Sequence, residues 1–305
     1  MIYTVTFNPA LDYVMKVNEL TTKDINRTES EQLFYGGKGI NVSVILSRLG
    51  IENKALGFVA GFSGKQLESM LEEDNIKTDF VTLKSGYTRI NVKIKSDKEL
   101  DINAQGPNID DDAVEELLSK LDKLKAGDCL VLAGSIPKTL PDDIYEKILK
   151  RLSGKGIDFA VDATGDLLVN VLKYKPILIK PNHHELGDIF SVQINTIDDI
   201  VKYAKKLQEM GARNVLVSRG KDGAALIDEN SDVHTMGNVP GKIKSSVGCG
   251  DSMLAGFLAG LYEKNDCRYA LKLGSACGNA TAFSDNLATR EEIDEMMKHE
   301  CFNTK

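Results

Sequence analysis

The sequence has no tryptophan, only five cysteines and seven prolines, and no long apolar run among its 305 residues. The cysteines are odd in number and never spaced as Cys-x-x-Cys, which argues against a disulfide framework or a zinc ribbon and predicts reduced thiols. The chain starts without the basic residues and apolar stretch of a signal peptide. No apolar run approaches the ~18 residues that a membrane-spanning helix needs. These absences predict a cytoplasmic protein.

The net charge of the chain bears on which macromolecules it could bind. A formal net charge of -7 argues against a protein that binds nucleic acid or an anionic membrane through its overall electrostatic field.

The composition and length indicate the class of protein. A content of 42% hydrophobic and 27% charged residues is typical of a globular enzyme. The length allows one large α/β domain or two smaller ones. No repeat, low-complexity segment or linker interrupts the chain, which favours one continuous domain over residues 1–305.

Short buried runs alternate with helical patterns. Continuously apolar runs at residues 129–133, 159–162, 177–179 and 215–218 are typical of parallel strands covered on both faces. Apolar residues at spacings of three and four occur over residues 114–121 and 197–207, as in helices packed on a sheet. The alternation predicts an α/β fold with a mainly parallel sheet flanked by helices.

Two segments, at about residues 12–35 and 88–103, break this alternation. Within the second, residues 89–95 alternate between apolar and polar with period two, as in a strand with one wet face. We expect a small antiparallel sheet with a hairpin turn at residues 96–98. It is either a lid over an active site or an edge extension without a catalytic role.

A glycine-rich turn precedes a helical pattern near residue 250. Ser246–Ser252 reads Ser-Val-Gly-Cys-Gly-Asp-Ser and leads into apolar residues at helical spacing. Gly248 and Gly250 let the backbone approach a ligand closely, and the unsatisfied amides of the first helical turn attract an anion. Asp251 beside such an anion site is either a base that accepts a proton from an attacking hydroxyl or a helix cap.

A second glycine-rich turn, Gly36–Asn41, also precedes a helical pattern. Lys38 and Asn41 add a cation and an amide suited to phosphate or hydroxyl groups. None of the five Gly-Lys pairs in the chain is followed by Ser or Thr, as a P-loop requires. Met253 stands where a dinucleotide fingerprint would need its third glycine, which disfavours a Rossmann dehydrogenase.

The two turns, in this order and about 210 residues apart, resemble the two signatures of the ribokinase/PfkB family of carbohydrate kinases. The resemblance covers nearly the whole chain and includes five further segments: Asn8–Asp12, Thr88–Arg89, Ala133–Pro137, Lys180–Glu185 and Ser218–Gly223. Three segments most resemble the branch of the family that phosphorylates fructose 1-phosphate: Asn8–Asp12, Arg89–Lys93 and Asn103–Pro107. Tagatose-6-phosphate kinases are the nearest alternative.

The resemblance implies a ribokinase-like fold and ATP-dependent phosphorylation of fructose 1-phosphate at its C6 hydroxyl. Asp251 would be the base, and the amides of Gly248, Cys249 and Gly250 would hold the γ-phosphate. The residues implied to bind the sugar phosphate are Asp12, Gly37, Lys38, Asn41, Arg89, Asn103 and Ser135. Those implied to bind ATP are Lys180, Asn182, Ser218, Gly220, Gly223, Gly278 and Asn279, with Glu185 placing Mg²⁺. Arg89 is alternatively a solvated strand residue, and pairing of two lids would give a homodimer.

Cys249 departs from the family pattern, in which alanine is common at this position. Because a thiol at a helix N-terminus tends toward a lowered pKa, we expect alkylation of Cys249 to block ATP binding. A sugar-phosphate sensor that binds without turnover remains an alternative to a kinase. The intact Gly248, Gly250 and Asp251 argue against the sensor.

Overall fold

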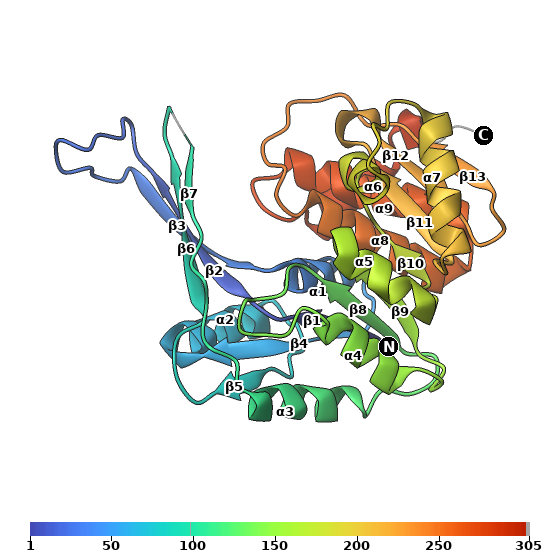
Figure 1. The fold of residues 1–305 in the computed structure, drawn as a ribbon. Helices are drawn as coiled ribbons and strands as arrows, with labels where there is room; N and C mark the ends of the chain where they lie inside the picture. The colour runs from blue at the N-terminus through green and yellow to red at the C-terminus, as the bar shows by residue number, and fades with distance from the viewer. Residues whose placement is uncertain (98, 303–305) are drawn as a thin grey trace.

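The computed structural model describes residues 1–97 and 99–302, in which helices cover both faces of a nine-stranded sheet and a four-stranded sheet projects from one side (Figure 1). The strands of the large sheet follow the order β13-β12-β11-β10-β9-β8-β1-β4-β5. They are β1 (Ile2–Thr6), β4 (Asn53–Ala60), β5 (Val81–Leu83), β8 (Cys129–Ala133), β9 (Asp158–Asp162), β10 (Leu178–Ile179), β11 (Asn214–Ser218), β12 (Ala224–Ile227) and β13 (Val233–Met236). Neighbouring strands from β5 to β11 pair in parallel, and β12 pairs antiparallel with both of its neighbours.

The four apolar runs predicted as strands are confirmed as β8, β9, β10 and β11. Strand β8 illustrates why they are apolar throughout. Its residues 129, 131 and 133 belong to one core cluster, while residues 130 and 132 belong to the cluster on the opposite face. Alternate side chains therefore enter two cores, as expected for a strand covered on both faces.

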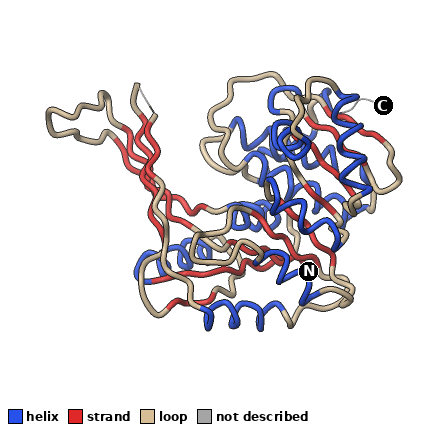
Figure 2. The backbone as a smooth tube through the Cα atoms, viewed as in Figure 1, coloured by secondary structure: helices blue, strands red, loops and turns tan. Residues whose placement is uncertain are grey.

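Two helical layers cover these faces, as the tube in Figure 2 shows. One layer contains α1 (Lys38–Arg48), α2 (Gly61–Glu73), α8 (Cys249–Lys264), α9 (Cys267–Phe283) and α10 (Arg290–Met297). The other contains α3 (Asp111–Leu121), α4 (Ile144–Leu152), α5 (Gly165–Val171), α6 (His183–Phe190) and α7 (Ile197–Glu209). Short 3₁₀ turns are η1 (Leu172–Tyr174), η2 (Gly220–Asp222) and η3 (Glu300–Phe302). The helical patterns at residues 114–121 and 197–207 are confirmed as α3 and α7.

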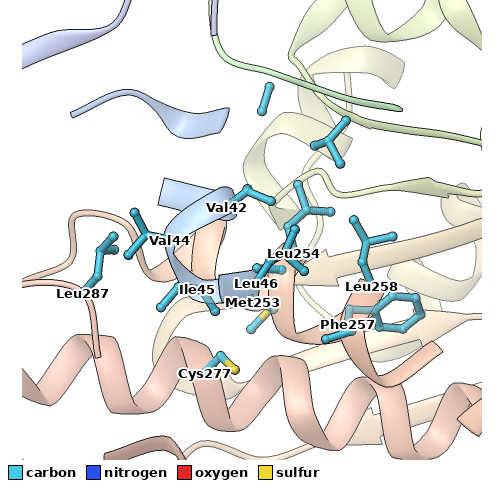
Figure 3. Packing of buried hydrophobic residues seen from close by; sticks show 14 of the residues in the cluster. Val42, Val44, Ile45, Leu46, Met253, Leu254, Phe257, Leu258, Cys277 and Leu287 are labelled. Atoms are coloured by element: carbon cyan, nitrogen blue, oxygen red, sulfur yellow. The ribbon is translucent and has the colours of Figure 1, made fainter. Parts of the chain in front are cut away.

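Helices α1 and α8 pack against each other in the first layer. Figure 3 shows Val42 and Leu46 of α1 beside Leu254 of α8, all fully buried. Helix α9 lies so close to α8 that a Cβ atom on Gly256 would stand 2.6 Å from the sulfur of Cys277. This packing fixes the two glycine-rich turns, at the starts of α1 and α8, relative to each other.

The small sheet has the order β3-β2-β6-β7, with strands β2 (Ala10–Lys16), β3 (Ser30–Gly36), β6 (Arg89–Lys95) and β7 (Leu100–Ile102). The period-two pattern of residues 89–95 is thus confirmed as a strand. The pairs β2–β3 and β6–β7 are antiparallel hairpins, but the central pair β2–β6 is parallel. The expected small antiparallel sheet is confirmed in these two hairpins. Only the pairing between them is parallel, because the long connection through α1, β4, α2 and β5 brings the second hairpin back in the same direction. Of the expected turn at residues 96–98, Lys98 lies outside the described residues.

Among the described residues, no helix combines the length and the apolar character that crossing a membrane requires.

Candidate active site

A cavity of about 490 Å³ opens at the carboxyl-terminal edge of the large sheet. Its wall includes the last residues of three strands: Thr6 of β1, Ala133 of β8 and Asp162 of β9. This edge is where open α/β sheets bind ligands. The predicted site residues that line the cavity are Asp12, Gly37, Lys38, Asn41, Arg89, Ser135, Lys180, Asn182, Glu185, Ser218, Gly248, Gly250 and Asp251.

The glycine-rich turn before α8 leaves backbone amides free. Gly248 has φ +79°, a left-handed conformation, and a Cβ atom there would stand 2.5 Å from Cδ2 of Leu287. Only glycine fits both requirements without strain. No described side chain caps the helix, so the amides of its first turn have no intrahelical partner. They form a site for an anion at the wall of the cavity.

The turn before α1 likewise contains a glycine with positive φ and no room for a Cβ atom. Gly37 has φ +126°, and a Cβ atom there would stand 2.7 Å from Cγ2 of Thr6. The tight turn lets α1 begin at Lys38, inside the cavity wall. One turn later, Asn41 enters the same wall.

Asp251 is a buried carboxylate with one oxygen held and one oxygen free. Asn41 donates a hydrogen bond of 2.8 Å from Nδ2 to Asp251 Oδ2, and Oδ1 makes no hydrogen bond to any described residue. The pKa of Asp251 is raised to about 6, first by burial and then by the nearby Asp162, against the lowering effects of Asn41, Lys38 and Lys180. The carboxylate does not cap α8. Of the two readings of Asp251, the geometry therefore favours the base.

Asp162 is a charged residue of this cavity that the sequence did not point out. Its Oδ2 lies 3.4 Å from Nζ of Lys38 and 3.5 Å from Nζ of Lys180. The sequence predicted both lysines as site residues, but it indicated only the end of a buried strand at Asp162. The one available signal was a charged residue at the carboxyl end of a parallel strand.

Asp12 is held by the small sheet. Asn91 donates a hydrogen bond of 2.8 Å to Asp12 Oδ1, and Lys93 Nζ lies 2.7 Å from Oδ2. Asn91 and Lys93 lie two residues apart within β6, on the face that carries Asp12. The period-two pattern of β6 contained this information, since both residues fall on its polar positions.

Arg89 stands at the start of β6, between the small sheet and the cavity. Its Nε donates a hydrogen bond of 3.0 Å to the carbonyl of Asn8, and its terminal nitrogens bond to no described residue. Burial lowers the pKa of Arg89, which Asp12 partly offsets. The residue is half-buried and lines the cavity, as a phosphate ligand would, rather than lying solvated on a strand.

A smaller cavity of about 240 Å³ adjoins the first and shares Ser218, Ser246 and Gly250 with it. The predicted nucleotide residues that line it are Ser218, Gly220, Gly223, Gly278 and Asn279. The side chain of Asn279 is already engaged, because it accepts a hydrogen bond from the amide of Val239 and donates one to the carbonyl of Ser275. Asn279 therefore fixes the loop that faces this cavity.

Cys249 also lines the smaller cavity, but its thiol differs from the expectation. The pKa of Cys249 is raised to about 11, first by burial and then by the charge of Asp251. The predicted lowering of the pKa is wrong, because desolvation and a neighbouring carboxylate outweigh the helix N-terminus.

Glu185 is the candidate ligand for a metal ion. One of its oxygens, Oε2, accepts a hydrogen bond from the amide of Asn182 within the capping box of α6. The other oxygen has no hydrogen-bond partner among the described residues. Within residues 1–97 and 99–302, no group of three or more His, Cys, Asp or Glu side chains is arranged to hold a metal. One free carboxylate oxygen fits Mg²⁺, which usually keeps several waters and binds phosphates.

Asn103 is the predicted site residue that the structure leaves apart. It is exposed, directly follows β7, and lines neither of the two cavities. The neighbouring loop is nonetheless tied to the site, since Asn8 Nδ2 donates a hydrogen bond of 2.8 Å to the carbonyl of Gln105.

Comparison with known proteins gives consistent relatives. Residues 5–293 match the model of the pfkB family of carbohydrate kinases. The chain is 45% identical over 298 residues to the 1-phosphofructokinase of Bacillus subtilis (strain 168), covering 97% of each chain. It is 37% identical over 296 residues to the D-tagatose-1-phosphate kinase of Bacillus licheniformis, again covering 97% of each. The crystal structure of phosphofructokinase-2 from Escherichia coli with substrates and products has a TM-score of 0.90 at 27% identity, covering 97% of this chain and 98% of that one.

Proposed function

The chain belongs to the pfkB family of carbohydrate kinases, and we propose that it transfers the γ-phosphoryl group of ATP to the C6 hydroxyl of fructose 1-phosphate, giving fructose 1,6-bisphosphate and ADP. The observation that carries this proposal is the position of Asp251. Asp251 lines a cavity whose wall also contains the uncapped first turn of α8. A base and an anion site in one cavity are what phosphoryl transfer to a hydroxyl needs.

Asp251 acts as the general base. Oδ2 is oriented by Asn41, and Oδ1 takes the proton from the C6 hydroxyl as that oxygen attacks the γ-phosphorus. With a pKa of about 6, the carboxylate is ionised at neutral pH but remains a better proton acceptor than an exposed aspartate. Its burial thus serves the reaction.

The amides of Gly248, Cys249 and Gly250 stabilise the charge on the transferred phosphoryl group. They are fixed before the reaction by the left-handed turn at Gly248, so no reorganisation is needed in the transition state. Lys180 adds a cation beside them, because its Nζ lies 3.1 Å from where a Cβ atom on Gly250 would stand.

The sugar phosphate binds between α1 and the base of the small sheet. Asp12, Gly37 and Asn41 orient hydroxyl groups, while Lys38, Arg89 and Ser135 surround the 1-phosphate. The guanidinium of Arg89 suits this task, because its terminal nitrogens present a rigid fork to phosphate. Asn103 lies outside the cavity, so we assign it no contact with the sugar.

ATP binds across the smaller cavity. Ser218, Gly220, Gly223 and Gly278 line the space for the nucleoside, while Lys180 and Asn182 face the phosphates from the larger cavity. Glu185 places Mg²⁺ through its free oxygen, partly through water. When bound, the ion neutralises charge on the phosphates during transfer.

The small sheet acts as a lid, and its outer face pairs with that of a second copy. Tyr13 lies directly opposite Leu33 and Val92, and Val92 lies opposite Ile102, so the four share the face turned away from Asp12. Leu33 is 37% and Ile102 is 55% exposed. An apolar face on a projecting sheet favours a homodimer in which the two lids cover each other.

A tagatose phosphate is the second candidate substrate, because a D-tagatose-1-phosphate kinase is among the relatives. Coupled ADP release with Mg-ATP decides between fructose 1-phosphate, fructose 6-phosphate, tagatose 1-phosphate, tagatose 6-phosphate and ribose. The highest kcat/KM is expected for fructose 1-phosphate. Preference for a tagatose phosphate would overturn the substrate and keep the mechanism. ATP binding without turnover on any of the five would favour the non-catalytic sensor.

A further inference from the structure

Asp162 ends β9 inside the cavity, and only 2% of its side chain is exposed. The proposed reaction gives this carboxylate no task. A lone anion beside bound phosphates is unfavourable, since like charges repel most strongly where water is excluded. Its presence therefore needs a reason, and the two lysines that share its Oδ2 supply one.

The two lysines come from different elements of the cavity wall. Lys38 begins α1, on the side of Gly37 and the sugar. Lys180 follows β10 and lies against the first turn of α8, on the side of the γ-phosphate. Their ammonium groups meet at one oxygen of Asp162, between the acceptor and the donor of the phosphoryl group.

The ion pairs with Asp162 hold both lysines in place. Lys180 is buried, and a buried cation without a partner is strongly destabilising. Burial alone would lower the pKa of Lys38, yet that pKa is raised, by Asp162 first and then by Asp251. Without Asp162 the two cations would repel each other, and Lys38, whose side chain is 43% exposed, would be free to swing into solvent.

We propose that Asp162 is a positioning residue that holds Lys38 against the sugar phosphate and Lys180 against the γ-phosphate, so that a single carboxylate aligns acceptor and donor. The inference rests on the proposed kinase function and extends it to a residue that contacts neither substrate. One anion and two cations leave the cluster with a net positive charge, which suits two phosphates brought close together.

The test compares the Michaelis constants of three variants at saturating Mg²⁺. Lys38→Met is expected to raise the KM for the sugar phosphate, and Lys180→Met the KM for ATP, each by roughly tenfold or more. Asp162→Asn is expected to raise both. In the double variant Asp162→Asn/Lys38→Met, the sugar effect should equal that of Lys38→Met alone, because Asp162 acts on the sugar through that lysine.

A matched control is Asp158→Asn, at the other end of the same strand, where Asp158 pairs with Arg213 at the opposite edge of the sheet. It should leave both KM values unchanged. If Asp162→Asn behaved like this control, the proposal would be wrong. It would also fail if Asp162→Asn raised the Mg²⁺ requirement and left both KM values unchanged, since Asp162 would then serve the metal.

The pH profile gives an independent readout. Asp251 is faced by Asp162 from β9, by Lys38 from α1 and by Lys180 after β10, and Cys249 is its neighbour on α8. Removing the negative charge of Asp162 should shift the acidic limb of kcat/KM to lower pH. The control Asp158→Asn should leave that limb in place, because Asp158 is not among the charges that act on Asp251.

Failure of this proposal can be distinguished from misfolding of a variant and from failure of the proposed function. If Asp162→Asn alone did not fold, the double variant with Lys38→Met, which removes one charge of each sign, should still show a raised KM for ATP relative to Lys38→Met. If the wild type turned over no sugar phosphate, the proposed function would fail. Calorimetric binding of ATP to wild type and Asp162→Asn would then test the hold on Lys180 alone, and equal affinities would contradict it.

Discussion

Asn41 and Asp251, separated by 210 positions, are joined by a hydrogen bond of 2.8 Å from the Asn41 amide to Asp251 Oδ2. Each residue lies near the start of a helix that begins directly after a glycine with positive φ, and the two helices pack against each other. The bond thus connects the sugar side of the cavity to its phosphate side. It also leaves Asp251 Oδ1 for the proton that the reaction releases.

The pH dependence of kcat/KM should report Asp251. Its pKa is raised to about 6, so the carboxylate becomes protonated below that pH and can no longer accept the proton of the hydroxyl. We expect kcat/KM for fructose 1-phosphate to fall about tenfold per pH unit below pH 6. A limb near pH 4, the range of an ordinary aspartate, would mean that burial does not tune this base.

The raised pKa of Asp251 should also lower the folding stability of the protein at neutral pH. An acid whose folded pKa is raised destabilises the fold once it is ionised, so this cost appears as the pH rises from about 4 to 6 and persists above. Asp251→Asn should therefore be more stable than the wild type at pH 7, by up to roughly 3 kcal/mol, and by much less near pH 4. Urea unfolding at both pH values measures this difference. An equal difference at the two pH values would contradict the raised pKa.

Gly248→Ala should separate the anion site from simple backbone strain. Alanine there would adopt φ +79° and meet Leu287, so the start of α8 must shift. We expect a large loss of kcat. The control is Gly127→Ala, where φ is +87° but nothing lies within 4 Å of the added Cβ. Both should lose about 1 kcal/mol or more in unfolding experiments, and only Gly248→Ala should lose turnover. Equal turnover in the two variants would argue against an anion site at this turn.

The lid should mediate dimerisation. Leu33→Asp places a charge on the apolar outer face of the small sheet, and analytical ultracentrifugation should show a dimer for the wild type and a monomer for the variant. Val233→Asp, at the exposed edge strand β13 of the large sheet, should stay dimeric. A monomeric wild type would rule out the lid pairing.

Local sequence signals predicted the two glycine-rich turns well. Gly37 and Gly248 stand where the backbone demands glycine, and such positions are visible without knowledge of the fold. The buried strands were equally predictable, because both faces of β8 demand apolar residues. The resemblance to the family supplied the roles of residues such as Arg89, which periodicity alone leaves open.

Interactions between distant segments were not predictable. In the sequence, Asp162 is recognisable only as the last residue of a strand. Its partners Lys38 and Lys180 come from two other parts of the chain. The pKa of Cys249 was predicted in the wrong direction, because the local helix N-terminus was visible and the burial was not. The parallel pairing of β2 with β6 likewise depends on how the intervening helices pack.

The most direct test of the account is the turnover of fructose 1-phosphate with Mg-ATP by the wild type and by Asp251→Asn. Coupled ADP release should show kcat lowered by roughly a thousandfold in the variant, with the affinity for ATP retained. Asp228→Asn, a buried aspartate on the far side of the sheet, should keep its kcat. A variant Asp251→Asn that turned over fructose 1-phosphate at nearly the wild-type rate would contradict the central role of Asp251.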